Sequence, residues 1–229
     1  MIEFALIGII IVITIFILVA TRENTMDLFC SAVGILNVEP ASCKAQDLLV
    51  DDFDNFDAWN ITSGEHWELH AGRLFVGPGG EHRAFTGDES WDDYIIIINE
   101  AVLERGDGFG VYFRVSGGPD INGYAFQYDP GFRANNLGGG QNGAFVIRKI
   151  VDGRELWPPL AVEPATMDYE WLEISRKVSV QVAGDTFTAY IDDQEVVQVT
   201  DDSYSEGRIG LGTWGGAEAS FDDLTVTQP

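Results

Sequence analysis

Residues 171–193, WLEISRKVSVQVAGDTFTAYIDD, are the stretch that is most informative about the fold. The stretch contains short runs rich in β-branched and aromatic residues, separated by charged residues, Gly and Asp. Such runs are typical of strands, and the Gly and Asp clusters are typical of turns. We therefore expect antiparallel strands joined by short turns over 171–175, 178–182 and 187–191.

The same pattern extends from Leu48 to the C-terminus, and no segment after residue 50 has a convincing helical period. This is the pattern of an antiparallel β-sandwich, which we place at residues 48–229. The further expected strands are 67–69, 73–76, 94–104, 109–115, 124–128, 144–150, 195–199, 209–212 and 217–226.

Several segments of this region resemble one family of β-sandwiches. The runs at 171–174, 178–180, 187–193 and 207–211 resemble the closing strands of concanavalin-like and laminin-G-like jelly rolls. The ending FDDLTV (221–226) resembles the last strand of that family, and DDF (51–53) resembles the first. The resemblance implies that the first and last strands are neighbours, but one jelly roll hosts lectins, hydrolases and spacers, so it implies little about function.

The chain begins with a very different segment, MIEFALIGIIIVITIFILVA (1–20). This segment is apolar all round apart from Glu3, and a helix of about 20 residues spans the hydrocarbon core of a bilayer. We predict a long hydrophobic helix over 1–37 and a linker over 38–47. An isolated carboxylate in such a helix needs a partner. Glu3 either lies in the headgroup region, where the N-terminal helix dipole favours it, or meets the N-terminal amine of a neighbouring subunit, which is the placement we expect.

Residues 2–36 resemble the mature N-terminus of type IV pilins, most closely the short Flp/Tad pilins. Glu3-Phe4 match the acidic-aromatic pair of that family, although mature pilins usually carry the glutamate at the fifth position, which suggests missing residues or an unusual start. The resemblance implies that Met1, Glu3 and Phe4 direct assembly into a filament of identical subunits. It also implies insertion in the inner membrane before assembly and an extracellular location afterwards. The alternative is a simple membrane anchor.

Two cysteines, Cys30 and Cys43, lie between the apolar segment and the β domain. If the helix continues to residue 37, the six residues 38–43 can double back over the roughly 10 Å to Cys30. A Cys30–Cys43 disulfide is thus sterically allowed in an oxidising exterior. The alternative is a buried Cys30 and an unpaired Cys43.

The formal net charge is −24, which disfavours nucleic acid and polyanionic partners. It favours solubility and cation binding. If the first and last strands are neighbours, the carboxylates at the two ends of the domain converge, and such hard oxygen ligands suit Ca²⁺. The predicted calcium ligands are Asp51, Asp52, Asp54, Asp222 and Asp223; the alternative is that they are simply solvated.

Sugar binding requires exposed aromatic rings for stacking and polar side chains for the hydroxyl groups. The most distinctive segment is NGYAFQYDPGF (122–132), in which alternation places Tyr124 and Tyr128 on one face and Gln127 and Asp129 on the other. The predicted ligand-binding residues are Tyr124, Gln127, Tyr128, Asp129, Trp157 and Trp214, with Trp91, Asn135 and Asn136 also available.

We predict no enzymatic activity. The best arrangement for catalysis is Asp168, Glu170 and Glu173, which on a bulged strand approximates the carboxylates of retaining glycosidases. No cleft lined by aromatic residues follows from the sequence around it. We therefore predict a structural subunit of a type IV-like pilus that displays the β domain outward, with adhesion as one role that such a display can serve. The alternative is an anchored lectin-like protein that binds surface glycans; an anchored glycoside hydrolase is a third reading.

Overall fold

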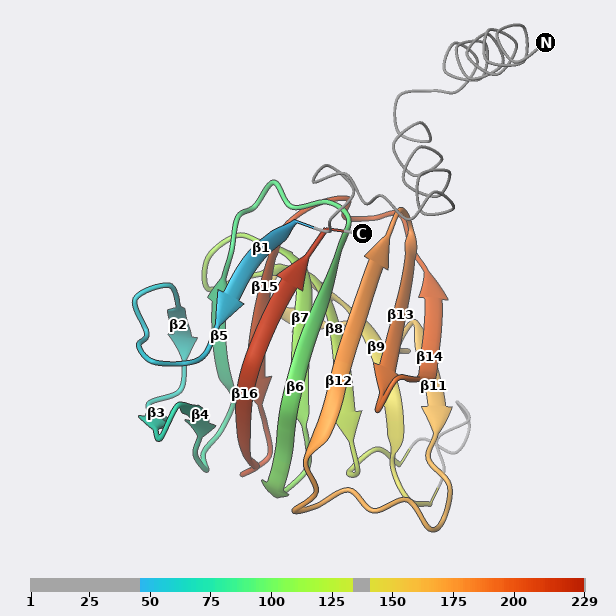
Figure 1. Cartoon of the computed structure of the whole chain (residues 1–229). Coiled ribbons are helices and arrows are strands. Elements are labelled where there is room, and N and C mark those ends of the chain that lie inside the picture. Colours follow the sequence, from blue (N-terminus) through green and yellow to red (C-terminus); the bar gives the residue numbers. More distant parts are fainter. Residues whose placement is uncertain (1–45, 134–140, 229) are drawn as a thin grey trace, which may run out of the picture. The chain divides into compact units, whose positions relative to one another are not determined.

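The computed structural model describes residues 46–133 and 141–228, which form an all-β sandwich of two sheets (Figure 1). The first sheet, sheet A, has eight strands, with the order β14-β13-β12-β6-β16-β4-β3 and β1 paired to β16. Their bounds are β1 Asp47–Asp51, β3 Trp67–His70, β4 Arg73–Val76, β6 Tyr94–Arg105, β12 Arg176–Ala183, β13 Thr186–Ile191, β14 Gln194–Thr200 and β16 Glu218–Thr227.

The second sheet, sheet B, lies behind sheet A in Figure 1 and also has eight strands. Its order is β10-β9-β8-β7-β15-β5-β2, with β11 paired to β9. The bounds are β2 Asn60–Ser63, β5 His82–Thr86, β7 Phe109–Ser116, β8 Asn122–Asp129, β9 Ala144–Val151, β10 Arg154–Glu155, β11 Ala161–Pro164 and β15 Arg208–Thr213.

The core lies between the two sheets and follows from the alternation of side chains along each strand. On β6, Tyr94, Ile96 and Ile98 point inward and are at most 1% exposed, whereas the residues between them are half-buried. From sheet B the inward residues include Phe113 and Tyr124, which stack with ring centroids 5.4 Å apart. Such aromatic contacts add to the apolar burial that holds the two sheets together.

The predicted contact between the first and last strands is confirmed. β1 runs antiparallel to β16, with Asp51 opposite Leu224. The first strand is Asp47–Asp51, however, and not the DDF segment that suggested it. Phe53 lies beyond the strand in a left-handed backbone conformation and is buried in the core.

The predicted fold class, a long helix joined to a β-sandwich, is corrected to an all-β sandwich. The described ranges contain no helix, and the predicted helix 1–37 and nearly all of the linker 38–47 lie outside the described residues. The same holds for Met1, Glu3, Phe4 and the proposed Cys30–Cys43 pair. Residues 46–133 and 141–228 contain no helical segment that could span a membrane.

One predicted strand is wrong. Residues 171–175 form an irregular segment before β12, although their composition is strand-like. Trp171 explains this difference, because its ring is buried against Tyr128 and Phe145, and its indole N–H donates to the Asn142 carbonyl 2.6 Å away. Core burial of one large side chain, rather than a strand ladder, accounts for the apolar composition here.

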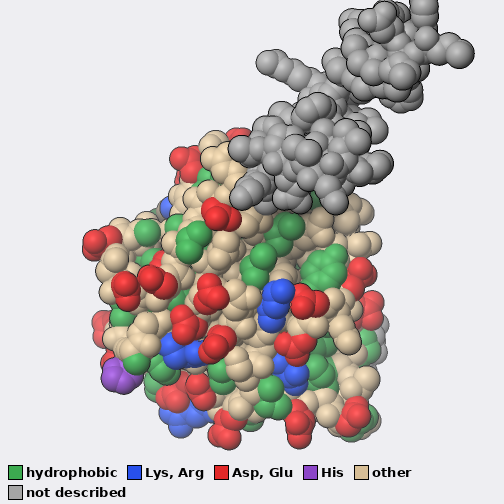
Figure 2. All heavy atoms as spheres, in the orientation of Figure 1, with side chains coloured by type: hydrophobic (Ala, Val, Ile, Leu, Met, Phe, Trp, Pro, Cys, Tyr) green, Lys and Arg blue, Asp and Glu red, His purple; other side chains and the backbone are tan. Residues whose placement is uncertain are grey.

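The outer face of sheet A is a charged surface without a concentrated patch. Figure 2 shows carboxylates scattered over it, with a few basic side chains between them. Several are paired, as in Lys177–Asp193 at 2.6 Å and Arg176–Asp192 at 2.8 Å. Such exposed pairs contribute little to stability, so the high net charge is spread over this face as solvated groups.

Candidate functional site

The outer face of sheet B carries polar side chains that are unusually well buried. Gln127, Asp129 and Arg148 are each less than 10% exposed. Gln127 and Asp129 alternate on β8 with the core residues Phe126 and Tyr128, and β9 runs antiparallel beside them with Val146 opposite Gln127. Because buried polar groups are costly without partners, a cluster of them on one sheet face indicates a built site.

Two glycines let aromatic rings lie close to this face. A Cβ at Gly212 would come 2.3 Å from the His82 carbonyl oxygen and 3.0 Å from the Tyr112 ring. A Cβ at Gly110 would come 3.3 Å from the Tyr112 ring and 3.6 Å from the Trp214 ring. Gly110 and Gly212 are opposite each other on β7 and β15. At this pair of glycines the sheet carries no side chains, which leaves room for the rings of Tyr112 and Trp214.

A hydrogen-bonded network joins β8, β9 and β10. Gln127 donates through Nε2 to Glu155 at 2.7 Å and accepts from Arg148 Nε, and Arg148 Nε lies 3.1 Å from the other Glu155 oxygen. Burial raises the pKa of Glu155, although Arg148 and Arg83 act in the opposite direction. The network fixes the Arg148 guanidinium in one orientation, as a binding or catalytic site requires.

Beside this network lies a cleft of about 350 Å³. Asp129 and Arg148 contribute to its lining, and Asp107 comes from the turn between β6 and β7. Burial raises the pKa of Asp129 to about 6, with Asp107 and Glu155 adding to the effect and Arg148 opposing it. A carboxyl group with such a pKa can change protonation near neutral pH, which is common in functional sites. The full lining is Asp107, Asp129, Gly131, Phe132, Arg133, Arg148, Trp157 and Trp214.

Aromatic side chains from separate loops contribute to the walls of the cleft. Trp157 follows β10 and is 62% exposed, a large value for a tryptophan, and Trp214 follows β15. The Arg148 guanidinium carbon lies 5.9 Å from the Trp157 ring centroid and 5.6 Å from that of Phe132. These cation–π contacts hold the rings around the charged floor. An open cleft with aromatic walls and a polar floor suits a ligand that has both apolar faces and hydroxyl groups.

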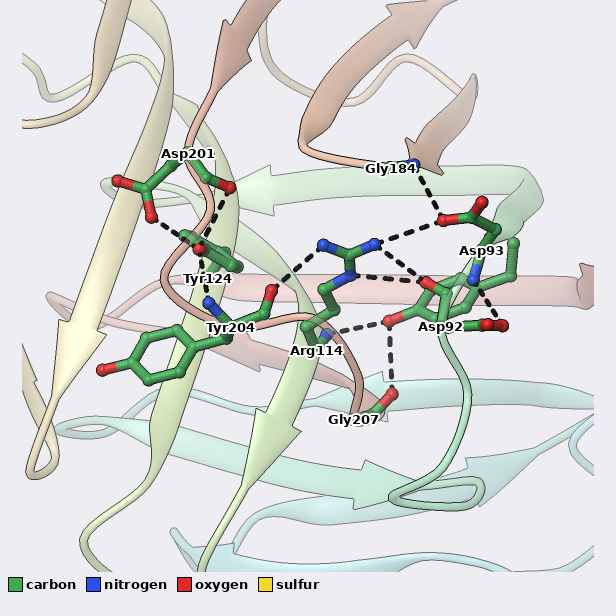
Figure 3. Close-up of polar contacts among 9 residues, drawn as sticks. Asp92, Asp93, Arg114, Tyr124, Gly184, Asp201, Tyr204 and Gly207 are labelled. Carbon is green, nitrogen blue, oxygen red and sulfur yellow. Dashed lines mark hydrogen bonds and ion pairs between the residues drawn. The ribbon is translucent and has the colours of Figure 1, made fainter.

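Four of the six predicted ligand-binding residues lie at this site: Gln127, Asp129, Trp157 and Trp214. The other two, Tyr124 and Tyr128, are core residues and are corrected. Tyr124 is fully buried, donates to Asp201 at 2.6 Å and accepts from the Tyr204 N–H at 3.1 Å (Figure 3). Tyr128 donates to the Trp171 carbonyl at 3.2 Å. Of the further residues, Trp91 packs on Tyr94, while Asn135 and Asn136 lie outside the described residues.

The charged partners of the site, chiefly Arg148 and Glu155, are not among the residues predicted from the sequence. Arg148 lies in FVIRKIV (145–151), where a cation on the alternating face of an apolar strand indicates a buried partner. Glu155 and Asp107 carry no such pattern, because both lie in or beside tight turns. Glu155 and Asp107 reach the site only because the topology brings their turns together at one end of sheet B.

The five predicted calcium ligands do not form a cluster. Asp51 accepts hydrogen bonds from the Trp59 indole and the Phe53 N–H, at 2.6 and 2.8 Å. Asp222 lies 3.6 Å from Arg73, and Asp223 accepts from Asn99 at 2.8 Å; Asp52 and Asp54 are exposed. Throughout the described ranges, no three His, Cys, Asp or Glu side chains are arranged to hold a metal ion. These aspartates therefore do not fit a calcium site.

The carboxylates considered for catalysis, Asp168, Glu170 and Glu173, also lack the expected arrangement. They lie in the irregular segment before β12. The predicted resemblance to glycosidases required these carboxylates to lie on one face of a strand, and no strand is present here. Glu173 has a positive φ of 57°, and its N–H donates to the Leu103 carbonyl at 2.9 Å. All three residues are exposed.

The fold and the cleft together define a class: a jelly-roll-like sandwich with an aromatic-walled, polar-floored cleft on one outer sheet face. The chain belongs to the 3-keto-alpha-glucoside-1,2-lyase-like domain family, whose model matches residues 46–227. The domain is thus carbohydrate-binding or glycosyl-hydrolase-like.

The chain is also similar to individual proteins. The chain is 26% identical over 175 residues to an extracellular exo-alpha-L-arabinofuranosidase of Streptomyces chartreusis, covering 74% of this chain but only 19% of that enzyme. The carbohydrate-binding module CBM66 of Bacillus subtilis superposes with a TM-score of 0.60 at 20% identity, over 75% of this chain and 96% of the module. The exoplasmic/lumenal domain of VIP36, solved with Ca²⁺ and Man3GlcNAc, gives 0.59 at 13% identity, over 79% and 87%. At these identities, the two structures show the fold alone.

These findings correct the prediction that the chain is a pilin. The matched family model covers the β domain and is carbohydrate-related, and the similar proteins include a glycosidase and carbohydrate-binding domains. The predicted filament, with its self-assembly and its membrane-inserted precursor, was inferred from residues that lie outside the described ranges. The predicted location in a pilus filament is also corrected, because the matched family is carbohydrate-related and the Streptomyces relative is described as an extracellular enzyme.

Proposed function

We propose that this domain binds a carbohydrate in the cleft on the outer face of sheet B, with a sugar ring against Trp157 and Trp214 and its hydroxyl groups on Asp129 and Arg148. The observation that carries the proposal is the exposed Trp157 beside a buried, hydrogen-bonded Arg148. Carbohydrates combine apolar C–H faces with hydroxyl groups, so they need this pairing of aromatic walls and fixed polar groups.

The charge of the cleft narrows the sugar class. The lining holds two carboxylates, Asp107 and Asp129, and two arginines, Arg133 and Arg148, so the cleft offers no excess of positive charge to an anionic sugar. Within a domain of strongly negative charge, this composition repels uronates and sulfated sugars. The proposed ligand is therefore an uncharged sugar.

The binding test uses isothermal titration calorimetry with glucose, arabinose and mannose, each also as the α-linked disaccharide and trisaccharide. We expect binding by at least one series. We also expect Trp157→Ala to weaken it by about tenfold, since one stacked ring contributes roughly 1–1.5 kcal/mol. The matched control is Leu156→Ala, because Leu156 is the neighbouring exposed residue but does not line the cleft. Equal losses in the two variants, or no binding in any series, would contradict the proposal.

A second candidate function is 1,2-elimination on a 3-keto sugar, and the pKa of Asp129 is the observation that favours it. A carbonyl at C3 acidifies the proton on C2, so a base can remove it. The C–H electrons then form the C1=C2 bond, the C1–O bond breaks, and the departing oxygen takes up a proton. A carboxylate with a pKa of about 6 is well placed to be such a base near neutral pH. Arg148 would stabilise the negative charge that develops on the C3 oxygen.

The activity test follows methanol release from methyl 3-keto-α-D-glucopyranoside. We expect the rate to rise with pH through about 6 as Asp129 ionises, and to fall by a factor of roughly 100 or more in Asp129→Asn. Methanol release that is unaffected by this substitution would exclude Asp129 as the base. A lack of methanol release, together with sugar binding, would leave a binding domain without this activity, in line with the prediction from sequence.

Calcium is not part of the proposal. The VIP36 domain was solved with Ca²⁺, but among the residues that the structure describes here the aspartates considered above do not gather into a metal site. We expect the midpoint of thermal unfolding to be the same in calcium chloride and in EDTA. A rise of several degrees with calcium would instead point to a site that the five aspartates do not account for.

A further inference from the structure

A second cleft of about 630 Å³ lies directly beside the proposed sugar site. Arg133 lines both clefts. Gly106 lines the second cleft, and the next residue, Asp107, lines the first. In the same way, Pro130 lines the second cleft and Gly131 lines the first. The ridge between the clefts therefore consists of two turns, each of which presents adjacent residues to the two sides.

The ridge has a defined conformation. The Gly131 N–H donates to the Asp107 carbonyl at 3.4 Å, so the two turns are joined to each other. Arg133 donates through Nη1 to the carbonyls of Pro130 and Phe132, at 2.6 and 2.9 Å. Arg133 is thereby held at the border, where it can contact a ligand that crosses from one cleft to the other.

The chemistry of the second cleft suits the continuation of an uncharged sugar chain. Leu172, which lines it, is 46% exposed, and Ile174 lies in the same wall. Asn142 is held by its Nδ2 donating to the carbonyls of Thr166 and Tyr169, at 2.8 and 2.9 Å. The side-chain oxygens of Glu170 and Glu173, which also line the cleft, are acceptors for hydroxyl groups.

The backbone holds the apolar wall in place. Glu173 adopts a positive φ of 57°, which costs energy for a residue other than glycine, and its N–H bonds to the Leu103 carbonyl at 2.9 Å. Trp171 is buried immediately before Leu172. Leu172 is thus held between two anchored residues with its side chain partly exposed at the second cleft.

From these contacts we propose that the second cleft is a further sugar subsite, so that the ligand is an oligosaccharide running from the Trp157–Trp214 cleft over Arg133 to Leu172 and Ile174. The inference rests on the proposed carbohydrate binding. The volume of the second cleft falls in the usual range for ligand sites, about 300–1,000 Å³. Two adjoining subsites predict that affinity grows with the length of the sugar chain.

The experiment measures affinities of the wild-type domain for glucose, maltose and maltotriose, and for the matched α-linked arabinose and mannose series. We expect the trisaccharide of the best series to bind about tenfold more tightly than its monosaccharide. Leu172→Asp should remove this gain and leave the monosaccharide affinity within about twofold. Met167→Asp is the matched control, since Met167 is 71% exposed in the same segment but lines neither cleft.

The outcomes separate the two proposals. Monosaccharide binding without any gain for longer chains, or a gain that persists in Leu172→Asp, would overturn the second subsite and leave the first intact. A loss of affinity in Leu172→Asp that is equal for all chain lengths would also overturn it. The absence of binding to every sugar would overturn both proposals. An unchanged midpoint of thermal unfolding in Leu172→Asp and Met167→Asp shows that the fold of both variants is intact.

Discussion

Two buried arginines, Arg114 and Arg148, are used in opposite ways. Arg114 is 2% exposed and donates to the carbonyls of Tyr204 and Asp92, at 3.0 and 3.2 Å (Figure 3). Arg148 is 9% exposed, but its partners are the side chains of Gln127 and Glu155 and the faces of aromatic rings. The Arg114 guanidinium also lies 3.3 Å from the Asp93 carboxylate and 5.3 Å from the Phe187 ring centroid, so it is enclosed within the fold. Arg148, in contrast, lines a cleft.

This difference indicates which polar group maintains the fold and which is available to a ligand. Backbone carbonyls in a loop have fixed positions, so a guanidinium that satisfies them ties the loops around residues 92 and 204 to β7. Side-chain partners beside an open cleft can be exchanged for ligand groups. The predictions below test this distinction, from the largest expected effect to the smallest.

The largest effect is expected for Arg114→Met. The substitution keeps much of the apolar stem but removes the donors to the carbonyls of Asp92 and Tyr204 and the ion pair with Asp93, which should lower the free energy of unfolding by about 3 kcal/mol. Urea unfolding measures this change. Arg148→Met, the matched variant, should cost about 1 kcal/mol, because Arg148 lines a cleft and its partner Glu155 is 29% exposed, so water can replace the guanidinium. Equal losses in the two variants would contradict the distinction between the two arginines.

The second prediction concerns pH. The pKa of Asp129 is raised from 3.8 to about 6 in the folded state, so folding favours its protonated form. This contribution is fully present below the unfolded pKa and is lost as the pH rises through about 6. It amounts to about 2–3 kcal/mol between pH 4 and 7.

Asp129→Asn removes this pH dependence, because an amide does not titrate. Relative to the wild type, we expect the variant to gain stability between pH 4 and 7, as measured by urea unfolding at several pH values. Asp202→Asn is the control, since Asp202 is an exposed carboxylate that does not line the cleft. If the difference between Asp129→Asn and the wild type were constant with pH, Asp129 would titrate normally.

The third prediction separates binding from stability at Arg148. Arg148→Lys keeps the positive charge but loses the planar group that contacts Gln127, Glu155 and the Trp157 ring together. We expect sugar affinity to fall by about tenfold, or about 1.4 kcal/mol, with a smaller change in the free energy of unfolding. Calorimetry and urea unfolding on the same preparation test this. A loss of stability without a loss of affinity would assign Arg148 to the fold.

The site and the fold differ in how far the sequence predicts them. Alternation in NGYAFQYD (122–129) separates Gln127 and Asp129 from the aromatic residues, because strand geometry is local. The same pattern does not say which face is the core, so Tyr124 and Tyr128 were also predicted to bind ligand. Trp171 shows a second limit, because burial by distant residues made a non-strand segment resemble a strand. The partnership of Asp107, Asp129 and Trp214 depends on three turns meeting, which no local pattern reveals.

The smallest effect is expected for an exposed ion pair, and a matched pair in the chain makes the test sharp. Lys177–Asp193 and Lys149–Asp201 both have an N···O distance of 2.6 Å. The side chains of the first pair are 36% and 73% exposed, and those of the second are 19% and 13% exposed. Water and salt screen the first pair, so its coupling energy should stay below about 0.5 kcal/mol. The second pair should be coupled by about 1–2 kcal/mol, because less solvent competes for it.

Double-mutant cycles of alanine substitutions, followed by urea unfolding, measure both couplings. The pH dependence supplies an independent readout. Burial acts to raise the pKa of Asp201, but hydrogen bonds from Lys149, Tyr124 and Ser203 outweigh it and hold this pKa below its usual value. The stabilisation is therefore present above the unfolded pKa of 3.8 and is lost as the pH falls toward the lower folded pKa. Equal coupling energies for the two pairs would mean that exposure does not set the strength of these interactions, and the contrast between enclosed and open charges would lose its physical basis.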